Sequence, residues 1–491
     1  MTLALTPRER RLLWGVLGLA VVVRVATLGA YPLLDPSESR YAEIARKMVE
    51  TGNWLTPQFA YGVPFWGKPP LSFWLTALSF SVLGVSEFAA RLPSFLLTAA
   101  TGWVVWRMAA RHAGRDAALL ATTVFATTGL VFISAGSVLT DLALMFGTTL
   151  AMAGFWEAVA AADRRRLAGN AMFFAGLAVG LLAKGPIGVV LSGVPIGAWV
   201  LLQRAWGPAW HRVHWIAGTA LAACVVVPWY VAAERATPGF LQYFIVGEHW
   251  QRFTQPGWTG DLYGTGHAWP RGSIWLFWLA AALPWSIVFL DWAVRCAWTP
   301  RATLAARTAD PFWRYLVAWT LAPMLFFTLS RNVLPSYVLP GLPAFALLVA
   351  CGPFAAGEGR PIDRAERRGL VAAALFACGF AVAVLVLHDR LEREYAQRGL
   401  VRAYAAARGG GDGRLIYYGD TPVSAEFYSG GKAQRVANIA ALQAYLADLP
   451  LDYFAVRESD LAGVPGDERA RLEPLGRFGE FGLYRERPAA R

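Results

Sequence analysis

The first residues in this sequence that could do chemistry are carboxylates near position 35. Asp35 and Glu38 lie just before RYAEIARKMVE, a segment whose apolar residues recur on one helical face. We expect a short helix from about Glu38 to Glu50, with Ser37 as its N-cap, lying flat on a membrane surface. A helix dipole keeps carboxylates at its N-terminus ionised, which suits a general base. On spacing alone, Asp35 or Ser37 could equally be a simple cap.

Several cations stand where apolar runs begin or end. Lys68 precedes two prolines in GKPPLSFW, and further cations are Lys184, Arg252 and Arg331 in LLAKGP, EHWQRF and LSRNVL. A fixed cation at a membrane surface can hold a phosphate, although it could equally anchor a helix end by snorkelling. Asp141 lies at the end of another apolar run, where an unanswered charge is expensive, so we expect it to be functional.

The histidines raise the question of a metal. His249 follows Glu248 in GEHWQRF, and His267 stands in the loop that follows. Only one close pair is present, so a hydrogen-bonded loop fits the pattern better than a metal site. The sequence contains no phosphate-binding glycine loop, dinucleotide-binding motif or serine nucleophile elbow. It therefore predicts no certain cofactor, with His249 as the candidate ligand if a divalent metal binds.

The elements that must position these groups are membrane helices. Of the 491 residues, 56% are hydrophobic and 16% are charged, and the mean hydropathy is +0.40. We expect about 11 to 13 transmembrane helices from apolar runs of bilayer-spanning length. This composition excludes a soluble globular protein, a disordered chain and a secreted disulfide scaffold.

Basic residues orient these helices. If the runs alternate across the bilayer, one set of loops collects arginines, at residues 8–11, 107–115, 164–166 and 204–212. The positive-inside rule places these loops and the N-terminus in the cytoplasm. The net charge of +12 is thereby explained without a nucleic-acid partner.

Two segments depart from the alternating pattern. Residues 71–84 are apolar but short, so we expect an interfacial or re-entrant helix on the outer side. The alternative is an ordinary transmembrane helix paired with one missed elsewhere. After residue 388 the composition changes to alternating strand-like and helix-like stretches, including RLIYYG and LDYFAVRE. We therefore predict a membrane domain at residues 1–388 and a small soluble α/β domain at residues 389–491.

Several motifs carry a family likeness when taken in order: RYAEIARKMVETGNWLTP, GKPPLSFWLTALSF, EFAARLPS, the Asp141 segment, GEHWQRF and LPSYVLPGLPAFALL. This series resembles the bacterial aminoarabinose lipid A transferases and the protein O-mannosyltransferase-like enzymes of the GT-C superfamily. The resemblance implies an all-α polytopic membrane fold with interfacial helices in the first periplasmic loop. It also implies an enzyme that moves a pentose, aminopentose or hexose, with inversion, from a polyprenyl-phosphate carrier to lipid A, a surface glycan or a protein.

The resemblance also assigns roles to residues. The acidic pair that precedes Arg-Tyr in the family falls on Ser37 and Glu38, so one acid is absent and Asp35 is its alternative. The family's Glu-Lys-Pro-Pro has Gly67 before Lys68 here, which puts a metal in doubt. The implied catalytic residues are Glu38, Asp35 and Asp141. The implied substrate contacts come from Arg40, Tyr41, Lys68, His249, Arg252, Arg331 and Tyr337.

The implied partners are a polyprenyl-phosphate-linked sugar donor, one of the acceptors named above and membrane lipids, without nucleic acid. The implied place is the bacterial inner membrane, with the active site and the C-terminal domain in the periplasm. A transporter or flippase of lipid-linked sugars is the alternative. Such a protein is expected to show repeated halves and charges near the middle of the bilayer, whereas the candidate charges here mainly gather on one outer surface.

Overall fold

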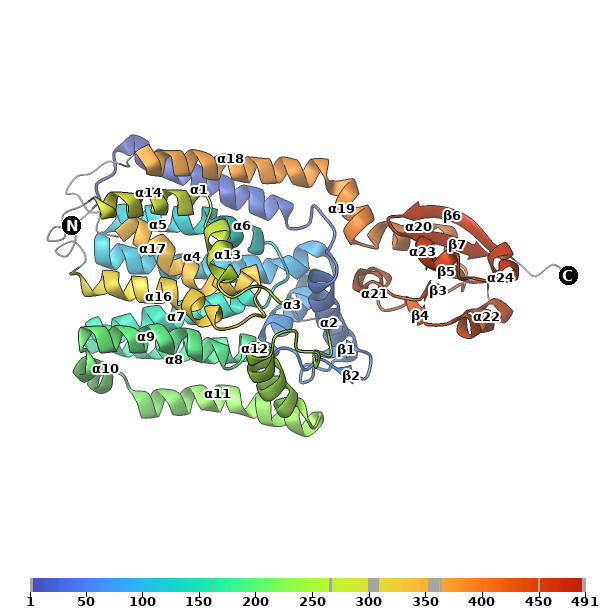
Figure 1. The fold of residues 1–491 in the computed structure, drawn as a ribbon, viewed down its shortest axis with the longest axis horizontal. Coiled ribbons are helices and arrows are strands. Elements are labelled where there is room, and N and C mark those ends of the chain that lie inside the picture. Colours follow the sequence, from blue (N-terminus) through green and yellow to red (C-terminus); the bar gives the residue numbers. More distant parts are fainter. Residues whose placement is uncertain are drawn as a thin grey trace.

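The structure, a computed structural model, describes residues 3–161, 163–264, 267–298, 309–351, 362, 364–448 and 451–487. A bundle of roughly parallel helices forms one end of the molecule, and a small α/β domain forms the other (Figure 1). The N-terminus lies at the end of the bundle farthest from the α/β domain. The predicted fold class, a helical polytopic membrane protein with an appended α/β domain, is confirmed.

The apolar runs of the sequence coincide with the helices of the bundle. These are α1 (Pro7–Thr27), α4 (Glu87–Ala113), α5 (Arg115–Thr127), α6 (Gly129–Ser134), α7 (Asp141–Ala160), α8 (Asp163–Lys184), α9 (Ile187–Gln203), α10 (Trp206–Arg212), α11 (Trp215–Ala236), α13 (Ser273–Ala281), α14 (Trp285–Ala297), α16 (Pro311–Thr328), the 3-10 helix η2 (Pro335–Gly341), α17 (Leu342–Cys351) and α18 (Arg364–Val386).

Fewer helices than predicted pass a strict test for crossing a bilayer. Within the described residues, α4, α7, α8, α11 and α18 are long and apolar enough, and α13 with α14 would make a sixth if the pair, bent by 110°, is one span. The run of α1 lies on an unbroken helix of 21 residues that also carries several arginines. Most of the other apolar runs lie on shorter or broken helices, because a count of apolar residues does not register a break such as the one after Thr127. The number of 11 to 13 spans stays a prediction.

The first loop folds at the outer end of the bundle, the end nearer the α/β domain. It contains α2 (Ser37–Thr51), the hairpin β1 (Gln58–Ala60) and β2 (Val63–Pro64), and α3 (Leu71–Leu83), the short apolar helix predicted from sequence. One expectation for α2 was wrong, because its N-cap is Pro36, without a side-chain cap, and Ser37 is its first residue. Its apolar face packs against α3, α4 and Phe427.

The C-terminal domain is a five-stranded mixed sheet with strand order β4-β3-β5-β7-β6, in which β3 is parallel to β4 and β5 and β7 is antiparallel to β5 and β6. Apolar clusters cover both of its faces. Its elements are α19 (His388–Tyr395), α20 (Arg398–Arg408), β3 (Leu415–Tyr418), α21 (Val423–Ser429), β4 (Gln434–Val436), α22 (Ile439–Ala447), β5 (Tyr453–Arg457), α23 (Glu458–Leu461), α24 (Gly466–Ala470), β6 (Leu472–Phe478) and β7 (Phe481–Glu486). The boundary at residue 388 stays a prediction.

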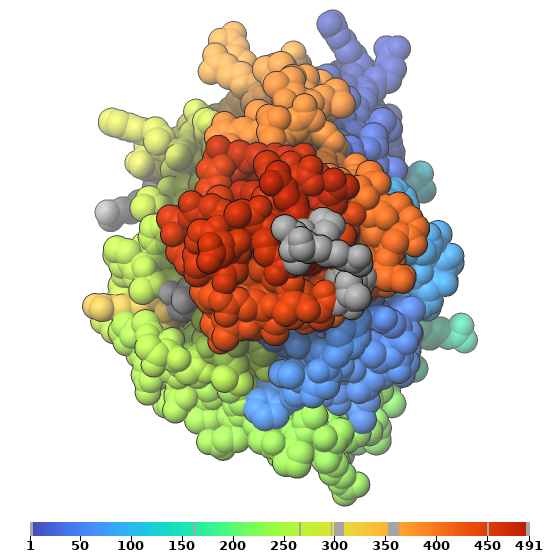
Figure 2. All heavy atoms as spheres, turned by 90° about the vertical axis from the view of Figure 1, so that its right-hand side faces the viewer, coloured from blue at the N-terminus to red at the C-terminus, as the bar shows by residue number. Residues whose placement is uncertain are grey.

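This domain docks on the first loop. The Lys47 ammonium of α2 donates to Glu426 of α21 at 2.9 Å, and the backbone N–H of Ser424 donates to Asp35 at 2.8 Å. Viewed from the outer end, the red C-terminal domain covers the centre of the face, and blue and green segments of the membrane part are exposed around it (Figure 2). The domain therefore rests on the segment that carries the predicted acids.

Candidate functional site

A cavity of about 450 Å³, here called the outer cavity, opens at the outer ends of α7, α8 and α9. Its charged lining consists of Lys68, Asp141, Lys184, Glu248 and Arg252. The remaining wall is mostly apolar, and its main contributions are from Leu144, Ile187, Val190, Leu191, Ile245, Phe253, Phe326 and Phe327. A cavity with charges at one part of its wall and apolar side chains elsewhere fits an amphiphilic ligand.

Element ends place these charges. Asp141 is the first residue of α7 and Lys184 is the last residue of α8. Lys68 precedes α3, with two prolines between. Glu248 lies in η1 (Gln242–Gln251), a π-helix, and Arg252 begins the short α12 (Arg252–Thr254). π-Helical turns are rare and occur often at functional sites, because they re-aim side chains within a helix.

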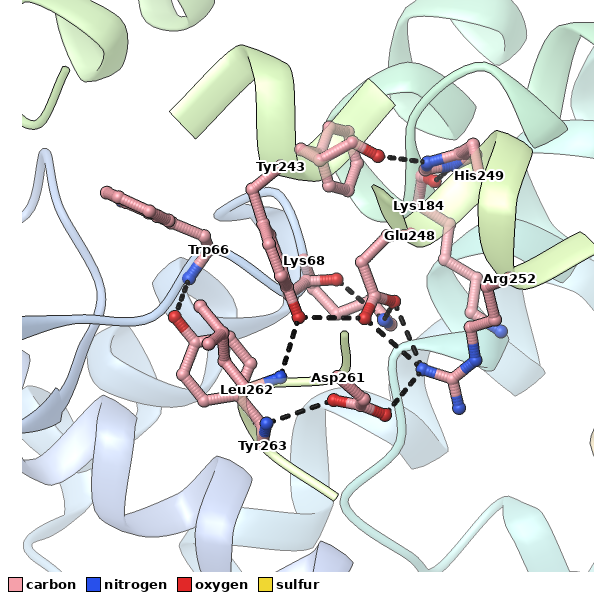
Figure 3. Close-up of polar contacts among 12 residues, drawn as sticks. Trp66, Lys68, Lys184, Tyr243, Glu248, His249, Arg252, Asp261, Leu262 and Tyr263 are labelled. Atoms are coloured by element: carbon pink, nitrogen blue, oxygen red, sulfur yellow. Dashed lines mark hydrogen bonds and ion pairs between the residues drawn. The ribbon is translucent and has the colours of Figure 1, made fainter. Parts of the chain in front are cut away.

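Glu248 is the centre of a hydrogen-bonded network (Figure 3). Lys68 Nζ donates to its carboxylate at 3.1 Å, and Arg252 Nη1 donates to both of its oxygens at 3.2 Å. The Tyr243 hydroxyl donates to Glu248 at 3.2 Å, and Arg252 Nη1 also donates to Asp261 at 3.0 Å. One carboxylate therefore holds two cations side by side at the cavity wall.

Burial and pairing act on these groups in opposite directions. Burial disfavours the charged form of Lys68, but the Glu248 carboxylate together with Tyr41 and Tyr337 outweighs this effect, and the pKa of Lys68 is raised. Burial likewise disfavours ionised Glu248, yet Lys68 and Arg252 bring the pKa of Glu248 below its ordinary value. All three groups therefore stay charged at neutral pH.

Asp141 and Lys184 form a second ion pair in the same wall. Lys184 Nζ donates to Asp141 Oδ1 at 2.7 Å, and its ammonium lies 4.8 Å from the centre of the Tyr337 ring. The lining of the cavity, as far as the structure describes it, thus carries three cations and two carboxylates. The excess positive charge favours an anionic ligand.

His249 lies in the cavity wall with both ring nitrogens facing backbone carbonyls. Nδ1 is 2.8 Å from the oxygen of Phe244 and Nε2 is 3.0 Å from the oxygen of Lys184. Burial lowers the pKa of His249, and a neutral ring can donate to only one of these two oxygens. Within the described residues no group of three His, Cys, Asp or Glu side chains could hold a metal. These contacts place His249 against the carbonyl of Lys184, the last residue of α8.

Glu38 lies outside the outer cavity, in a buried clamp. Arg91 donates to both carboxylate oxygens of Glu38 at 2.8 Å, and the backbone N–H groups of Leu34 and Val138 donate to it at 3.1 Å. Arg91 is itself fully buried. The carboxylate has accepted four hydrogen bonds from the protein, so no acceptor position is left for a substrate proton.

Asp35 lies at the junction with the C-terminal domain. Its carboxylate accepts hydrogen bonds from the backbone N–H and the hydroxyl of Ser424 and from the hydroxyl of Ser39. Burial raises the pKa of Asp35 although these bonds favour its ionised form. Like Glu38, Asp35 is not among the residues that line the outer cavity.

The other predicted site residues fall into two groups, those that line the outer cavity and those that do not. Lys68, Asp141, His249, Arg252 and Tyr337 all line the outer cavity, as the resemblance implies for a donor site. Arg40, Tyr41 and Arg331 are absent from its lining. Their positions are these: Arg40 donates to the Tyr263 carbonyl, Tyr41 packs edge-on against Phe73, and the Arg331 side chain is exposed.

Three residues of this region were missed or given another role by sequence reasoning. Glu248 was considered only as a metal ligand, although its spacing of four from Arg252 indicates an ion pair on one helix. Asp261 and Arg91 were not considered. Arg91 had a signal of its own, because an arginine inside the apolar stretch EFAARLPSFLL needs a buried partner. Nothing in the sequence points to Asp261.

Comparison with known proteins gives concordant results. A family model described as dolichyl-phosphate-mannose-protein mannosyltransferase matches residues 16–244. An undecaprenyl phosphate-α-4-amino-4-deoxy-L-arabinose arabinosyl transferase of Erwinia tasmaniensis is 31% identical over 325 residues, which cover 65% of this chain and 55% of that protein. Its counterpart from Shewanella sediminis is 30% identical over 376 residues, 75% of this chain and 64% of that protein. The chain thus spans less than two thirds of the length of these relatives.

Solved structures agree on the fold. The ArnT structure from Cupriavidus metallidurans bound to undecaprenyl phosphate superimposes with a TM-score of 0.77 at 20% identity, covering 96% of this chain and 98% of that one. The apo Archaeoglobus fulgidus oligosaccharyltransferase gives a TM-score of 0.52 at 11% identity, covering 91% of this chain and 70% of that one. This chain is therefore a polytopic membrane protein with the fold of that ArnT structure, and in sequence it resembles the aminoarabinose transferases.

Proposed function

We propose that this chain is a glycosyltransferase that moves a pentose, aminopentose or hexose from a polyprenyl-phosphate carrier to an acceptor such as lipid A, a surface glycan or a protein. The observation that carries this proposal is the outer cavity, where three cations stand in an otherwise largely apolar wall. A polyprenyl phosphate has the matching chemistry, with an anionic head and an apolar chain. The names of the relatives in sequence support the same donor class.

The cations act on the leaving group. When the bond between the sugar and the carrier breaks, negative charge grows on the carrier phosphate, and preorganised cations stabilise that charge most in the transition state. Lys68 and Arg252 are held side by side by Glu248 for this task. Tyr337 and Lys184 stand on another part of the same wall, where they contact the sugar or the phosphate.

The acceptor attacks the anomeric carbon from the opposite face, with inversion. Of the acids predicted from sequence, Asp141 is the one in the outer cavity, and it is paired with Lys184 at 2.7 Å. A carboxylate held in this way by an ammonium can accept a hydrogen bond from a sugar hydroxyl, so we assign it the orientation of the sugar. An acceptor that is already an oxyanion, such as a phosphate, needs no base.

The orientation in the membrane is part of the same proposal. We place the N-terminus in the cytoplasm and the outer cavity with the C-terminal domain in the periplasm of a bacterial inner membrane, because arginine-rich loops gather at the opposite end of the bundle. A divalent metal is not required by the steps above. The proposed boundary between the domains stays at residue 388.

The proposal is tested by transfer from a panel of polyprenyl-phosphate sugars in purified membranes. We expect wild type to consume one donor, and Lys68→Met to lower the rate by about 10²- to 10³-fold because one cation at the leaving phosphate is lost. Lys432→Met is the matched control, since Lys432 is exposed in the C-terminal domain. Equal transfer by wild type and Lys68→Met would refute the site. Movement of intact carrier-linked sugar across the bilayer without consumption would favour a transporter.

A further inference from the structure

A second cavity, here called the inner cavity, lies toward the other end of α9. It has a volume of about 550 Å³ and is lined by residues of α7, α8, α9, α10 and α11. Its walls are almost entirely aliphatic and aromatic, among them Phe155, Phe173, Ile196, Trp210 and Trp215. Ser192, the hydroxyl residue in this lining, donates to the carbonyl of Gly188 in its own helix at 3.0 Å. A cavity without charges in its lining fits a hydrocarbon chain.

Two glycines of α9 keep the inner cavity open to the side. Gly193 and Gly197 are exposed, and a Cβ atom added at either would meet no atom within 4 Å. Gly188 in the same helix is different, because a Cβ there would lie 2.8 Å from the backbone of Gly180. Close helix packing therefore explains Gly188 and not Gly193 or Gly197, whose missing side chains leave a trough.

The two cavities lie on different faces of the same helix, and its exposed side runs between them. Ile187, Val190 and Leu191 line the outer cavity, and the neighbouring Val189 and Ser192 line the inner one. Val189, Gly193, Val194 and Gly197 are exposed along the outside of α9. With 17 residues, α9 is roughly 25 Å long, which is most of the ~30 Å thickness of a hydrocarbon core.

We propose that the inner cavity binds the distal isoprenoid units of the polyprenyl carrier whose phosphate lies in the outer cavity. This inference rests on the proposed function and adds a second recognition site for the same donor. A chain that leaves the outer cavity beside α9 meets the trough of Gly193 and Gly197 next, and then the aromatic walls around Trp210. Phospholipid tails are as apolar as an isoprenoid chain, so the preference of the inner cavity for the isoprenoid arises from packing and is modest.

The test is equilibrium binding of two phosphates, farnesyl phosphate and undecaprenyl phosphate, to the full chain in lipid nanodiscs. We expect wild type to bind the longer carrier about threefold to tenfold more tightly. In Gly193→Leu/Gly197→Leu the added side chains fill the trough, so this difference should vanish while farnesyl phosphate binds as in wild type. Gly379→Leu in α18 is the matched control, because a Cβ there also meets nothing within 4 Å.

A photoreactive group at the far end of undecaprenyl phosphate locates the chain independently. We expect cross-links to residues of α9, α10 or the start of α11, and their loss in the double leucine variant. Equal affinity of wild type for both carriers, or cross-links confined to other helices, would overturn the inference while leaving the proposed function intact. Labelling of the inner cavity by a phospholipid chain alone would overturn it as well. Failure of both phosphates to bind would refute the proposed function itself.

Discussion

The outer end of the bundle contains two sets of buried charges that differ in how completely the protein pairs them. In the clamp of Glu38 and Arg91, the guanidinium donates to both carboxylate oxygens and to the carbonyls of Leu28, Tyr31 and Pro32. All five N–H groups of an arginine are thereby used. In the outer cavity, Lys68 donates to Gly67 and Glu248, and the hydrogen bonds from the Arg252 guanidinium to other described residues all come from Nη1.

This difference separates charges that hold the fold from charges that can bind a ligand. A saturated clamp fixes the start of α2 against α4 and has nothing left to offer a substrate. The cations of the outer cavity are only partly satisfied, so they keep N–H groups that can donate hydrogen bonds to a phosphate oxygen. Glu38 was chosen for its position in a motif, as Lys68 and Arg252 were, and the contacts in the folded chain place it in the first class and them in the second.

The largest effect is expected from breaking the clamp. Arg91→Met leaves Glu38 buried without its cation, and the loss of one partner from a buried pair costs about 3–5 kcal/mol of unfolding free energy. Denaturant unfolding of the purified chain in detergent measures this loss. Replacing both partners, in Arg91→Met/Glu38→Leu, removes the stranded charge and should restore much of the stability. A single variant as stable as wild type would show that the clamp does not hold the fold.

The next largest effect is expected from a comparison of two arginines, both of which were predicted from sequence to contact the substrate. Arg252 lines the outer cavity, whereas Arg331 is exposed and outside its lining. We expect Arg252→Met to weaken binding of a polyprenyl phosphate about 10- to 100-fold, and Arg331→Met to change it by less than about threefold. Titration of the carrier phosphate against each purified variant gives the answer. Similar losses in both variants would contradict the assignment of the outer cavity.

A smaller effect of opposite sign is expected at Glu248. Glu248→Gln removes the negative charge between Lys68 and Arg252, so an anionic carrier should bind severalfold more tightly, by about 1 kcal/mol. The pKa of Glu248 is lowered in the folded state, so in wild type its charge is complete above its ordinary pKa and is lost only as the pH falls through the depressed value. Between about pH 5 and pH 8 the ratio of the two affinities should therefore stay constant. If the affinity of Glu248→Gln divided by that of wild type approached one as the pH is lowered toward 5, Glu248 would not be held ionised.

Much of the fold follows from sequence, because it depends on features that are local. Runs such as those of α7 and α18 are apolar over a bilayer-spanning length, and RLIYYG and LDYFAVRE became β3 and β5 as predicted. The breaks within apolar runs were not predicted, since two short helices and one long helix have similar composition.

The site was only partly predictable for a different reason. Lys68, Arg252 and Tyr337, predicted as substrate contacts, line the outer cavity, but no sequence pattern shows that Glu248 joins Lys68 across 180 positions. The position of Glu38 and Asp35 outside that lining was not predictable for the same reason. Their partners, Arg91 and Ser424, lie 53 and 389 positions away, and only the folded chain brings them together.

The smallest effect tests the junction between the two domains. Ser424→Ala removes the hydroxyl bond to Asp35, and also the bond that this hydroxyl accepts from the backbone N–H of Gln397 at 3.0 Å, and should cost about 1 kcal/mol of unfolding free energy at neutral pH. Burial raises the pKa of Asp35, so the folded chain holds that proton more firmly than the unfolded chain, and the stability contributed by Asp35 falls as the pH rises through this window. The hydroxyl limits that loss by stabilising the ionised form.

The deficit of Ser424→Ala should therefore be larger at neutral pH than below the ordinary pKa of an aspartate, where Asp35 is protonated in both states. Denaturant unfolding at the two pH values measures it. Ser459→Ala is the matched control, because Ser459 also donates to an aspartate, Asp460, but is exposed. A deficit that is the same at both pH values would mean that the hydroxyl does not act through the charge of Asp35. The deficit would then come from the bond between Ser424 and Gln397 within the C-terminal domain, without the electrostatic character that distinguishes the buried charges at the outer end.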